Sequence, residues 1–349
     1  MNFIDVFISV VFLLLLALPG FILTKVKFMP KGADGVLSTL VLYVCQPMLV
    51  LISFQKTKFT PEVGLNMLIV AGLTILVHLL MIVIMFIFYR HKTSKKVADG
   101  ADAVAAEDEA RRQKINCLRF AGIFSNCGFM GLPFLQSIFA GQTGIEGEIL
   151  VYAGVVIAIF NLFTWSVGIF IVSGDRKLMS FKKALVNPTV ISLIIGVMLF
   201  LIFPQPLNEL ATKGSVLDKI LDELMNGLNF LAGMVTPLSM TVIGIKLANS
   251  NLKRIFLDKW AYVNAFNKLI VMSIVSMLVV AFLPISSIMK YCIFFLLSMP
   301  SATSTVMFAV RFGGDSDSGT VFVLLSTILS CVSIPLMFLV MNGIFGIAI

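Results

Sequence analysis

The sequence predicts an all-α integral membrane protein with ten membrane-spanning helices. We expect two inverted five-helix repeats, in which the fourth and ninth helices are broken and cross each other. The first observation is composition: the 349 residues are 59% hydrophobic and only 13% charged, unlike soluble domains. The second is the recurrence of apolar segments of about 20 residues, the length that crosses a hydrocarbon core about 30 Å thick. The third is that two such segments carry helix-breaking residues at matching places.

Ten apolar segments are the candidate membrane helices. A β-barrel would instead show alternating segments of about ten residues, which the sequence lacks. The first segment is interpreted as a retained helix rather than a secretory signal, because it starts with Asp5 and its positive charges follow the apolar run. The expected helices are 3–24, 35–54, 64–89, 115–139, 147–173, 188–204, 226–248, 260–284, 287–311 and 317–345.

The positions of the 26 Lys and Arg residues predict the orientation. Twenty lie in or beside the loops that follow the odd-numbered segments, five lie on the other side, and Lys268 lies within the eighth segment. This asymmetry places both termini outside and the loop 91–113 in the cytoplasm. The net charge of +8 therefore reflects topology, and we do not expect nucleic-acid binding.

Enzymatic and metal motifs are missing from the sequence. The five cysteines form no CxxC pair, and the two histidines fit no HExxH pattern. There is no P-loop for ATP and no visible nucleophile–base pair. We therefore expect no enzyme, no metal site and no cofactor.

The chain repeats itself in its two halves. FAGQTG at 139–144 and FGGDSD at 312–317 are 173 residues apart, and Gln46-Pro47 corresponds to Thr236-Pro237. Because each half holds five helices, an odd number, the second half enters the membrane from the opposite side. Inverted repeats are typical of transporters, whose halves exchange conformations to give alternating access.

The fourth segment is interrupted by SNCGFMGLPF at 125–134. Gly128 and Gly131 lower helix propensity, Pro133 removes an amide donor, and Asn126 supplies a side chain that can replace lost backbone partners. Unpaired backbone groups are costly in lipid, so such a break must be buried in protein or line a cavity.

The ninth segment is interrupted in the same way by SMPSATST at 298–305. Pro300 breaks the helix, while Ser301, Thr303 and Ser304 offer hydroxyl groups. Matching breaks in the two halves predict one shared site near the membrane midplane.

The chemistry of this site favours an anion. Half-helices that begin near Gly128 and Ser301 would aim amide N–H groups and a positive dipole end into it. All 18 acidic residues fall in loops or at helix ends, which argues against a carboxylate-based cation or proton site. A small carboxylate is the ligand that suits these groups.

Other polar and kinking residues have two interpretations each. Lys268 either snorkels toward the cytoplasm or points its ammonium into the core, where it attracts the anion or ties the eighth segment to the broken ones. Pro47 and Pro237 either only kink their helices or, with Gln46 and Ser239, form a fixed wall. Asn161 either lines the site or bonds back to its own helix.

Two polar or amphipathic segments lie outside the expected membrane helices. Residues 93–113 mix both signs of charge and are interpreted as a solvated helix or linker. Residues 215–228 have apolar side chains at helical spacing and are expected to lie on the outer surface.

Five motifs in order are similar to those of the auxin efflux carrier family, which includes plant PIN-formed carriers and bacterial permeases for malate or malonate. The resemblance covers essentially the whole chain. It is carried by NCGFMGLP at 126–133, the FAG that follows it, Asn187-Pro188, TPLSMTVIGIKLA at 236–248 and SMPSATSTVMFA at 298–309.

The resemblance implies a dimeric scaffold, 1–55 and 188–249, and a mobile transport domain, 63–173 and 259–346, that moves as an elevator. It also implies organic anions as substrates, with Asn126 and Pro300-Ser301 as contacts where the broken helices cross. Two features depart from the plant carriers: Ser301 stands where they have asparagine, and only about 14 residues, 174–187, replace their long central loop.

We therefore expect a secondary transporter of small organic anions, namely mono- or dicarboxylates such as malate, malonate or auxin-like acids. It is expected as a homodimer in a plasma membrane, in contact with lipid. A membrane ligand sensor that kept this fold, or an anion channel, are the alternatives. The expected substrate-binding residues are Gln46, Pro47, Asn126, Cys127, Gly128, Gly131, Pro133, Asn161, Pro237, Ser239, Lys268, Pro300, Ser301, Thr303 and Ser304.

Overall fold

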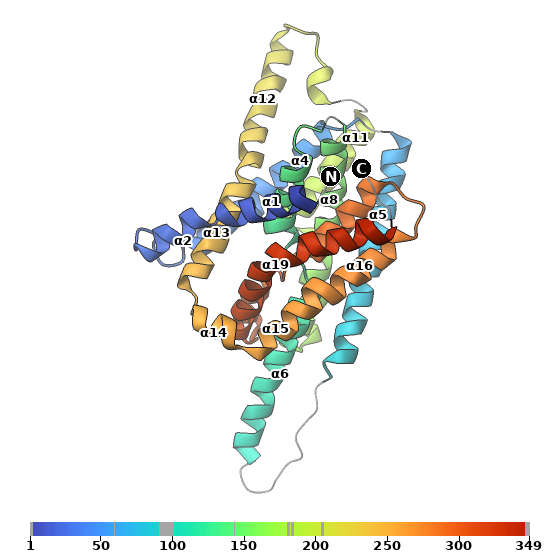
Figure 1. The fold of residues 1–349 in the computed structure, drawn as a ribbon. Helices are drawn as coiled ribbons and strands as arrows, with labels where there is room; N and C mark the ends of the chain where they lie inside the picture. Colours follow the sequence, from blue (N-terminus) through green and yellow to red (C-terminus); the bar gives the residue numbers. More distant parts are fainter. Residues whose placement is uncertain are drawn as a thin grey trace.

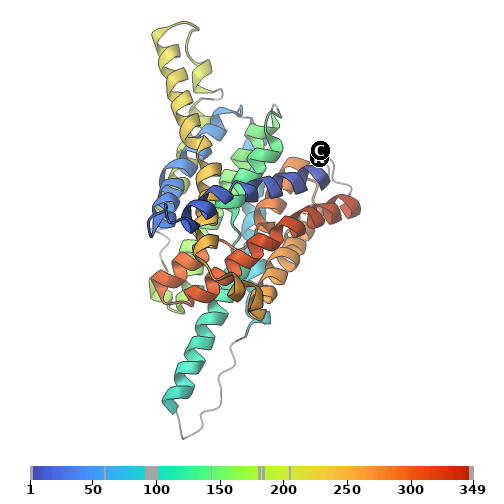
Figure 2. The ribbon, with the colours of Figure 1, turned by 60° about the vertical axis from the view of Figure 1, so that its left-hand side comes forward.

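The computed structural model is a bundle of long helices (Figures 1 and 2). Within the described part of the chain every regular element is a helix, and extended pairing is confined to a single β-bridge between Ser125 and Ser301. The predicted all-α class is therefore confirmed. The structure describes residues 3–58, 60–90, 101–142, 144–179, 182, 185–203 and 206–345.

The first half of the chain forms five helical runs, three of which contain a π-helical turn. These turns are η1, η2 and η3, and η2 follows a break in the helix. The helices are α1 (Phe3–Leu15), α2 (Leu18–Lys25), α3 (Ala33–Leu40), η1 (Val41–Cys45), α4 (Gln46–Gln55), α5 (Pro61–Phe88), α6 (Ala101–Ile123), η2 (Cys127–Gly131), α7 (Leu132–Phe139), α8 (Ile145–Phe163), η3 (Thr164–Gly168) and α9 (Ile169–Ser173).

The second half contains two short 3₁₀ turns, η4 and η5, and one further π-helical turn, η6. Its longest helix, α19, contains Pro335. The elements are η4 (Arg176–Leu178), α11 (Pro188–Ile202), η5 (Leu207–Glu209), α12 (Val216–Gly233), α13 (Val235–Asn249), α14 (Leu252–Leu257), α15 (Lys259–Phe266), η6 (Asn267–Val271), α16 (Met272–Ala281), α17 (Ser287–Ser298), α18 (Ser304–Phe312) and α19 (Ser316–Phe345).

Seven helical runs in the described residues are long and apolar enough to cross a membrane, and three shorter apolar helices accompany them. The chain is therefore a multi-pass membrane protein. These ten pieces fall in the ten predicted segments in order, while the inverted symmetry of the two halves stays a prediction. The seven runs are Phe3–Lys25, Ala33–Gln55, Pro61–Phe88, Ile145–Ser173, Val216–Asn249, Lys259–Ala281 and Ser316–Gly343, and the shorter helices are Cys127–Phe139, Pro188–Ile202 and Ser287–Ser298.

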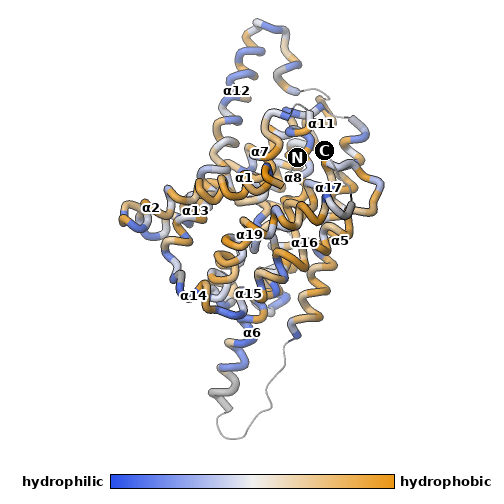
Figure 3. The backbone as a smooth tube through the Cα atoms, viewed as in Figure 1, coloured by the Kyte–Doolittle hydropathy of each residue, from blue (hydrophilic) through white to orange (hydrophobic). Residues whose placement is uncertain are grey.

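Helices α6 and α12 start earlier than the fourth and seventh predicted segments. Each begins with polar turns, and no cap separates these from the apolar turns that follow. Helix α6 begins at Ala101, so residues 101–113 form a helix continuous with the fourth segment, while 93–100 lie outside the described residues. Helix α12 begins at Val216, after the cap Ser215, and projects from the bundle instead of lying on its surface (Figure 1). Figure 3 shows hydrophilic residues at these projecting ends of α6 and α12.

Other helix starts follow directly from the sequence. Thr60 precedes Pro61 and its hydroxyl accepts a hydrogen bond from the amide of Val63 at 3.2 Å. Asn187 precedes Pro188 and caps α11 in the same way. Capping side chains followed by proline at the first helical position are a standard helix start.

The helices pack mainly in two sets. Helices α2, α3, α4, α11, α12 and α13 contact one another, and α5, α6, α8, α9 and α15–α19 contact one another. The sets meet where α4 and α11 pack on α8, and α1, which is in neither set, packs on α19 and α7. The division into a scaffold and a transport domain, and the movement of one against the other, stay predictions.

Glycines allow the closest helix contact in the first set, between α2 and α13. A Cβ atom on Gly244 would lie 2.0 Å from the carbonyl oxygen of Ala17, and one on Gly20 would lie 2.3 Å from that of Thr241. Small residues at helix interfaces let backbones approach, which is a main source of helix association in membranes.

We expect Gly244→Ala to destabilise the protein by about 1–3 kcal/mol, the usual cost of overpacking, because its methyl group would collide with backbone. Gly72→Ala on α5 is the control, since a Cβ there meets nothing within 4 Å. Thermal unfolding of both variants in detergent would check this. Equal melting temperatures for the two would contradict the close contact of α2 and α13.

Candidate functional site

The two predicted helix breaks lie in contact with each other. Helix α6 ends at Ile123 and the chain becomes helical again at Cys127, while α17 ends at Ser298 and α18 begins at Ser304. Ser125 and Ser301 form an antiparallel β-bridge between the two non-helical stretches. We call this pair of breaks, 124–126 and 299–303, the crossover.

The two breaks satisfy each other's backbone groups. The amide of Asn126 donates to the carbonyl of Pro300 at 2.8 Å, and the amide of Ala302 donates to the carbonyl of Phe124 at 2.9 Å. Irregular backbone at membrane depth is tolerated only where such groups find partners inside the protein. The breaks therefore stabilise each other, and neither is expected to hold its shape alone.

Lys268 lies at the crossover and does not snorkel. Its side chain is completely buried. Its Nζ donates to the hydroxyl of Ser125 at 2.6 Å and lies 3.4 and 3.3 Å from the carbonyl oxygens of Ile123 and Leu297. Of the two interpretations of this lysine, the structure supports the one in which it ties its helix to the broken ones.

Two further side chains bind Ser301. The amide Nδ2 of Asn264, one turn before Lys268, donates to the hydroxyl of Ser301 at 3.0 Å. The backbone amide of Ser301 donates to the hydroxyl of Ser326 on α19 at 3.1 Å. The break in the ninth segment is thus fixed by α15 on one side and α19 on the other.

Gln46 faces the start of η2. A Cβ on Gly128 would lie 2.5 Å from Nε2 of Gln46. Gly128 therefore leaves room for the Gln46 amide, and a larger residue there would make this side-chain end shift. Pro47, the next residue, is buried at the start of α4, so this part of the expected wall does lie against the broken helix.

Several buried polar atoms near the crossover have no hydrogen-bond partner in the described residues. Two of them are amide donors, Nε2 of Gln46 and Nδ2 of Asn126, and two are hydroxyls, of Ser239 and Ser304. Leaving such groups unpaired costs about 1–3 kcal/mol each. Such groups are commonly paired with water, an ion or a ligand.

The other residues expected from the motif lie in the broken helices themselves. Cys127, Gly131 and Pro133 are buried in η2 and the start of α7, and Thr303 is buried at the start of α18. A Cβ on Gly131 would lie 2.7 Å from the side chain of Leu296. Gly131 and Pro133 thus shape the crossover and present no polar side chain to it.

Two expected residues do not reach the crossover through any contact of their side chains. Pro237 is exposed in the first turn of α13, while its neighbour Thr236 donates to Gln136 of α7 at 3.3 Å. Asn161 donates to the carbonyl of Ile157 in its own helix and accepts from Asn187.

Ser125 and Asn264 are contacts that the sequence did not predict. Ser125 directly precedes the expected Asn126, and Asn264 lies four residues before Lys268. Residues four apart share a helix face, so a polar pair at this spacing inside an apolar helix was the available signal.

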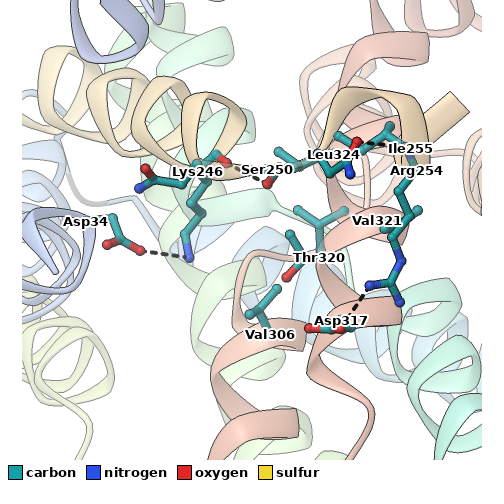
Figure 4. Close-up of a pocket in the computed structure, with 13 residues that line it drawn as sticks. Asp34, Lys246, Ser250, Arg254, Ile255, Val306, Asp317, Thr320, Val321 and Leu324 are labelled. Atoms are coloured by element: carbon teal, nitrogen blue, oxygen red, sulfur yellow. Dashed lines mark hydrogen bonds and ion pairs between the residues drawn. The ribbon is translucent and has the colours of Figure 1, made fainter. Parts of the chain in front are cut away.

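A cavity of about 350 Å³ lies between the two sets of helices (Figure 4). Lys246 with Asp34 lines one side, and Arg254 with Asp317 lines the other; the pairs are ion pairs of 3.4 and 2.9 Å. The hydrogen bond to Asp317 raises the pKa of Arg254 above its ordinary value, so this cation stays charged.

The inner wall of the cavity approaches the crossover. Val323 lines it, and the carbonyl of Val323 accepts a hydrogen bond at 3.0 Å from Ser326, the residue that binds Ser301. Val306, two residues after Ser304, lines it as well. The cavity therefore lies at the end of the bundle that carries α14, and its wall at Val323 is one helical turn from the contact of Ser326 with the crossover.

The sequence model of a family described as "Membrane transport protein" matches residues 110–338, more than half of the chain. The matched range contains both breaks of the crossover. No curated protein matches the chain. Among the described residues, no group of three or more His, Cys, Asp or Glu side chains is placed to hold a metal ion.

We expect Ser301→Ala to destabilise the protein by about 1–3 kcal/mol, because the buried Nδ2 of Asn264 loses its closest acceptor. Ser273→Ala is the matched control, since the buried Ser273 hydroxyl has no partner to lose in the described structure. Melting temperatures in detergent measure both effects. A Ser301→Ala protein as stable as the control would argue against this contact.

Proposed function

Because the chain belongs to the membrane transport protein family that includes the auxin efflux carriers, we propose that it is a secondary transporter of small organic anions. The proposed substrates are mono- or dicarboxylates such as malate, malonate or auxin-like acids. The proposed site is the crossover, and the proposed membrane is the plasma membrane.

The observation that carries an anionic substrate is the pair of unpaired amide donors beside the start of η2, while an unpaired acceptor of the crossover, Oδ1 of Asn264, lies on α15. The amides of Gln46 and Asn126 are buried and unpartnered. They lie where the helix Cys127–Phe139 begins, and a helix N-terminus offers free amide N–H groups and a positive dipole end. No Asp or Glu among the described residues is buried, so no carboxylate repels an anion from within the core.

The proposed mechanism is alternating access by an elevator movement. The crossover belongs to the set of helices α5, α6, α8, α9 and α15–α19, and Gln46 reaches it from the other set. A substrate held between Asn126 and Gln46 would therefore lie at the boundary of the two sets. Sliding of one set along the other would carry it across the membrane, and the exchange of conformations between the two repeats would give alternating access.

The position of the cavity indicates which side of the membrane it opens to. It is lined by Lys246 and Arg254, which belong to the loops predicted to face the cytoplasm. We propose that the structure represents an inward-facing state, with both termini outside and the cavity as the cytoplasmic entrance. A homodimer formed through the scaffold helices remains part of this proposal.

We expect Asn126→Ala to lower the initial rate of carboxylate uptake by about tenfold or more, the loss expected for one hydrogen bond to a charged group. The assay is uptake of radiolabelled malate, malonate, lactate and indole-3-acetate into proteoliposomes, with membrane potential, Na⁺ and pH gradients set independently. Expression and melting temperature should change little, because Nδ2 of Asn126 has no partner to lose within the protein.

Asn229→Ala on α12 is the matched control, because its amide bonds only to a carbonyl of its own helix in the described structure. Wild-type flux in Asn126→Ala would remove the crossover from the mechanism. Ligand binding without uptake in the unmodified protein would favour a sensor. Currents that do not saturate with substrate would favour a channel.

We expect Thr320→Cys to react with a membrane-impermeant thiol reagent added from the cytoplasmic side, because Thr320 lines the cavity. Substrate should slow the reaction if it enters by this route. The background for this test is Cys331→Ser, since Cys331 is partly exposed whereas Cys45, Cys117, Cys127 and Cys292 are buried. Labelling in inside-out and right-side-out vesicles, read by mass spectrometry, shows from which side of the membrane the cysteine is accessible.

Leu217→Cys on the exposed face of α12 is the control for the opposite side. It should react only with reagent added outside. Labelling of Thr320→Cys from the outside alone would reverse the proposed orientation.

A further inference from the structure

Lys268 is a buried cation whose described neighbours include no acid. Its relative exposure is 0%, and no Asp or Glu in the described chain is buried. Its hydrogen-bond acceptors are the hydroxyl of Ser125 at 2.6 Å and the carbonyl oxygens of Ile123 and Leu297 at 3.4 and 3.3 Å. A buried charge is costly unless it is compensated, so these oxygens must supply the compensation.

The two carbonyls belong to the C-terminal turns of two different helices. Ile123 is the last residue of α6, and Leu297 is the next to last of α17. A helix C-terminus carries about half a negative charge on its unpaired carbonyls. Two such ends converge on one ammonium, so that together they offset about one positive charge.

Other titratable side chains close to Lys268 do not supply a negative charge. His78 on α5 interacts electrostatically with it and is fully buried, and its Nδ1 is bonded to the carbonyl of Thr74 at 2.8 Å. Cys127 of η2 also interacts with it and is a buried thiol. The compensation of Lys268 therefore comes from helix ends and a hydroxyl.

Ser125 connects these groups into one arrangement. Its hydroxyl accepts from Lys268 and donates to the carbonyl of Leu297 at 2.6 Å. Lys268 itself is in the π-helical turn η6, and such turns are frequent at functional sites. The ammonium thus links α15 and α16, through η6, to both helices that end at the crossover.

Carbonyls of unwound backbone and the C-terminal ends of half-helices are the groups that bind a coupling Na⁺ in transporters with broken helices. We propose that Lys268 is a tethered cation that takes the place of such an alkali-metal ion at the crossover. Transport then needs no Na⁺, and the positive charge moves with the broken helices in every cycle. The transport part of this inference rests on the proposed function.

The test compares the wild-type protein with Lys268→Met in NaCl and in choline chloride. The wild-type melting temperature and carboxylate uptake should be the same in both salts. Lys268→Met should lose uptake by about tenfold or more in choline. NaCl should restore a large part of its uptake and raise its melting temperature in a saturable way, because Na⁺ can then bind to the oxygens that the ammonium no longer contacts.

Lys290→Met is the matched control. Lys290 also donates to a carbonyl near a helix C-terminus, that of Ala281 at 3.0 Å, but it is only partly buried. Water can replace its ammonium there. Its melting temperature should not respond to Na⁺ in preference to choline.

Three results would overturn the inference: a wild-type protein that requires Na⁺ for uptake, full Na⁺-independent uptake by Lys268→Met, or a loss that Na⁺ does not relieve. If Lys268→Met is not recovered folded in either salt, Lys268→Gln replaces it in the test, because glutamine keeps a hydrogen-bond donor and removes the charge. A melting temperature of Lys268→Gln that does not respond to Na⁺ then counts against the inference. If no carboxylate is taken up by the wild type, the proposed function fails, while the melting temperatures still test the tethered cation.

Discussion

Backbone groups that leave a helix inside a membrane must find partners within the protein, and the architecture around the crossover depends on this constraint. Here the partners are mutual: Asn126 bonds to Pro300, and Ala302 bonds to Phe124. Each break is stable because the other one is present. The helices that surround the crossover then serve to hold this contact, through Asn264 on one side and Ser326 on the other.

The same break separates opposite charges. The helix ends that stop at the crossover, those of α6 and α17, carry negative dipole ends and meet the ammonium of Lys268. The helix that starts there, Cys127–Phe139, carries a positive dipole end and lies beside the unpaired amides of Asn126 and Gln46. On one side of the crossover the helix ends and the ammonium of Lys268 offset each other, while the other side keeps unpaired amide donors.

Sequence patterns identified more of the site than of its internal contacts. Glycine and proline at 128–133 and at 300 indicated both breaks to within a few residues, because these residues lower helix propensity. The first break itself lies at 124–126, and Gly128, Gly131 and Pro133 are helical in η2 and α7. Pro237 is a proline like Pro300, yet its side chain is exposed. Asn161 is an asparagine like Asn126, yet it bonds within its own helix and to Asn187. Ser125 and Asn264 have ordinary sequence contexts, and their roles arise from partners more than 30 residues away, at 268 and at 301.

The sequence by itself determined the membrane class, the order of the helical segments and the places where two of them break. These properties depend on hydropathy and on local backbone chemistry, which act over a few residues. Only the tertiary structure decided which way Lys268 points, which polar atoms stay unpaired, and that α12 projects from the bundle. The physical reason is that a buried side chain takes its partners from whichever helix packs beside it, and that neighbour is distant in the chain.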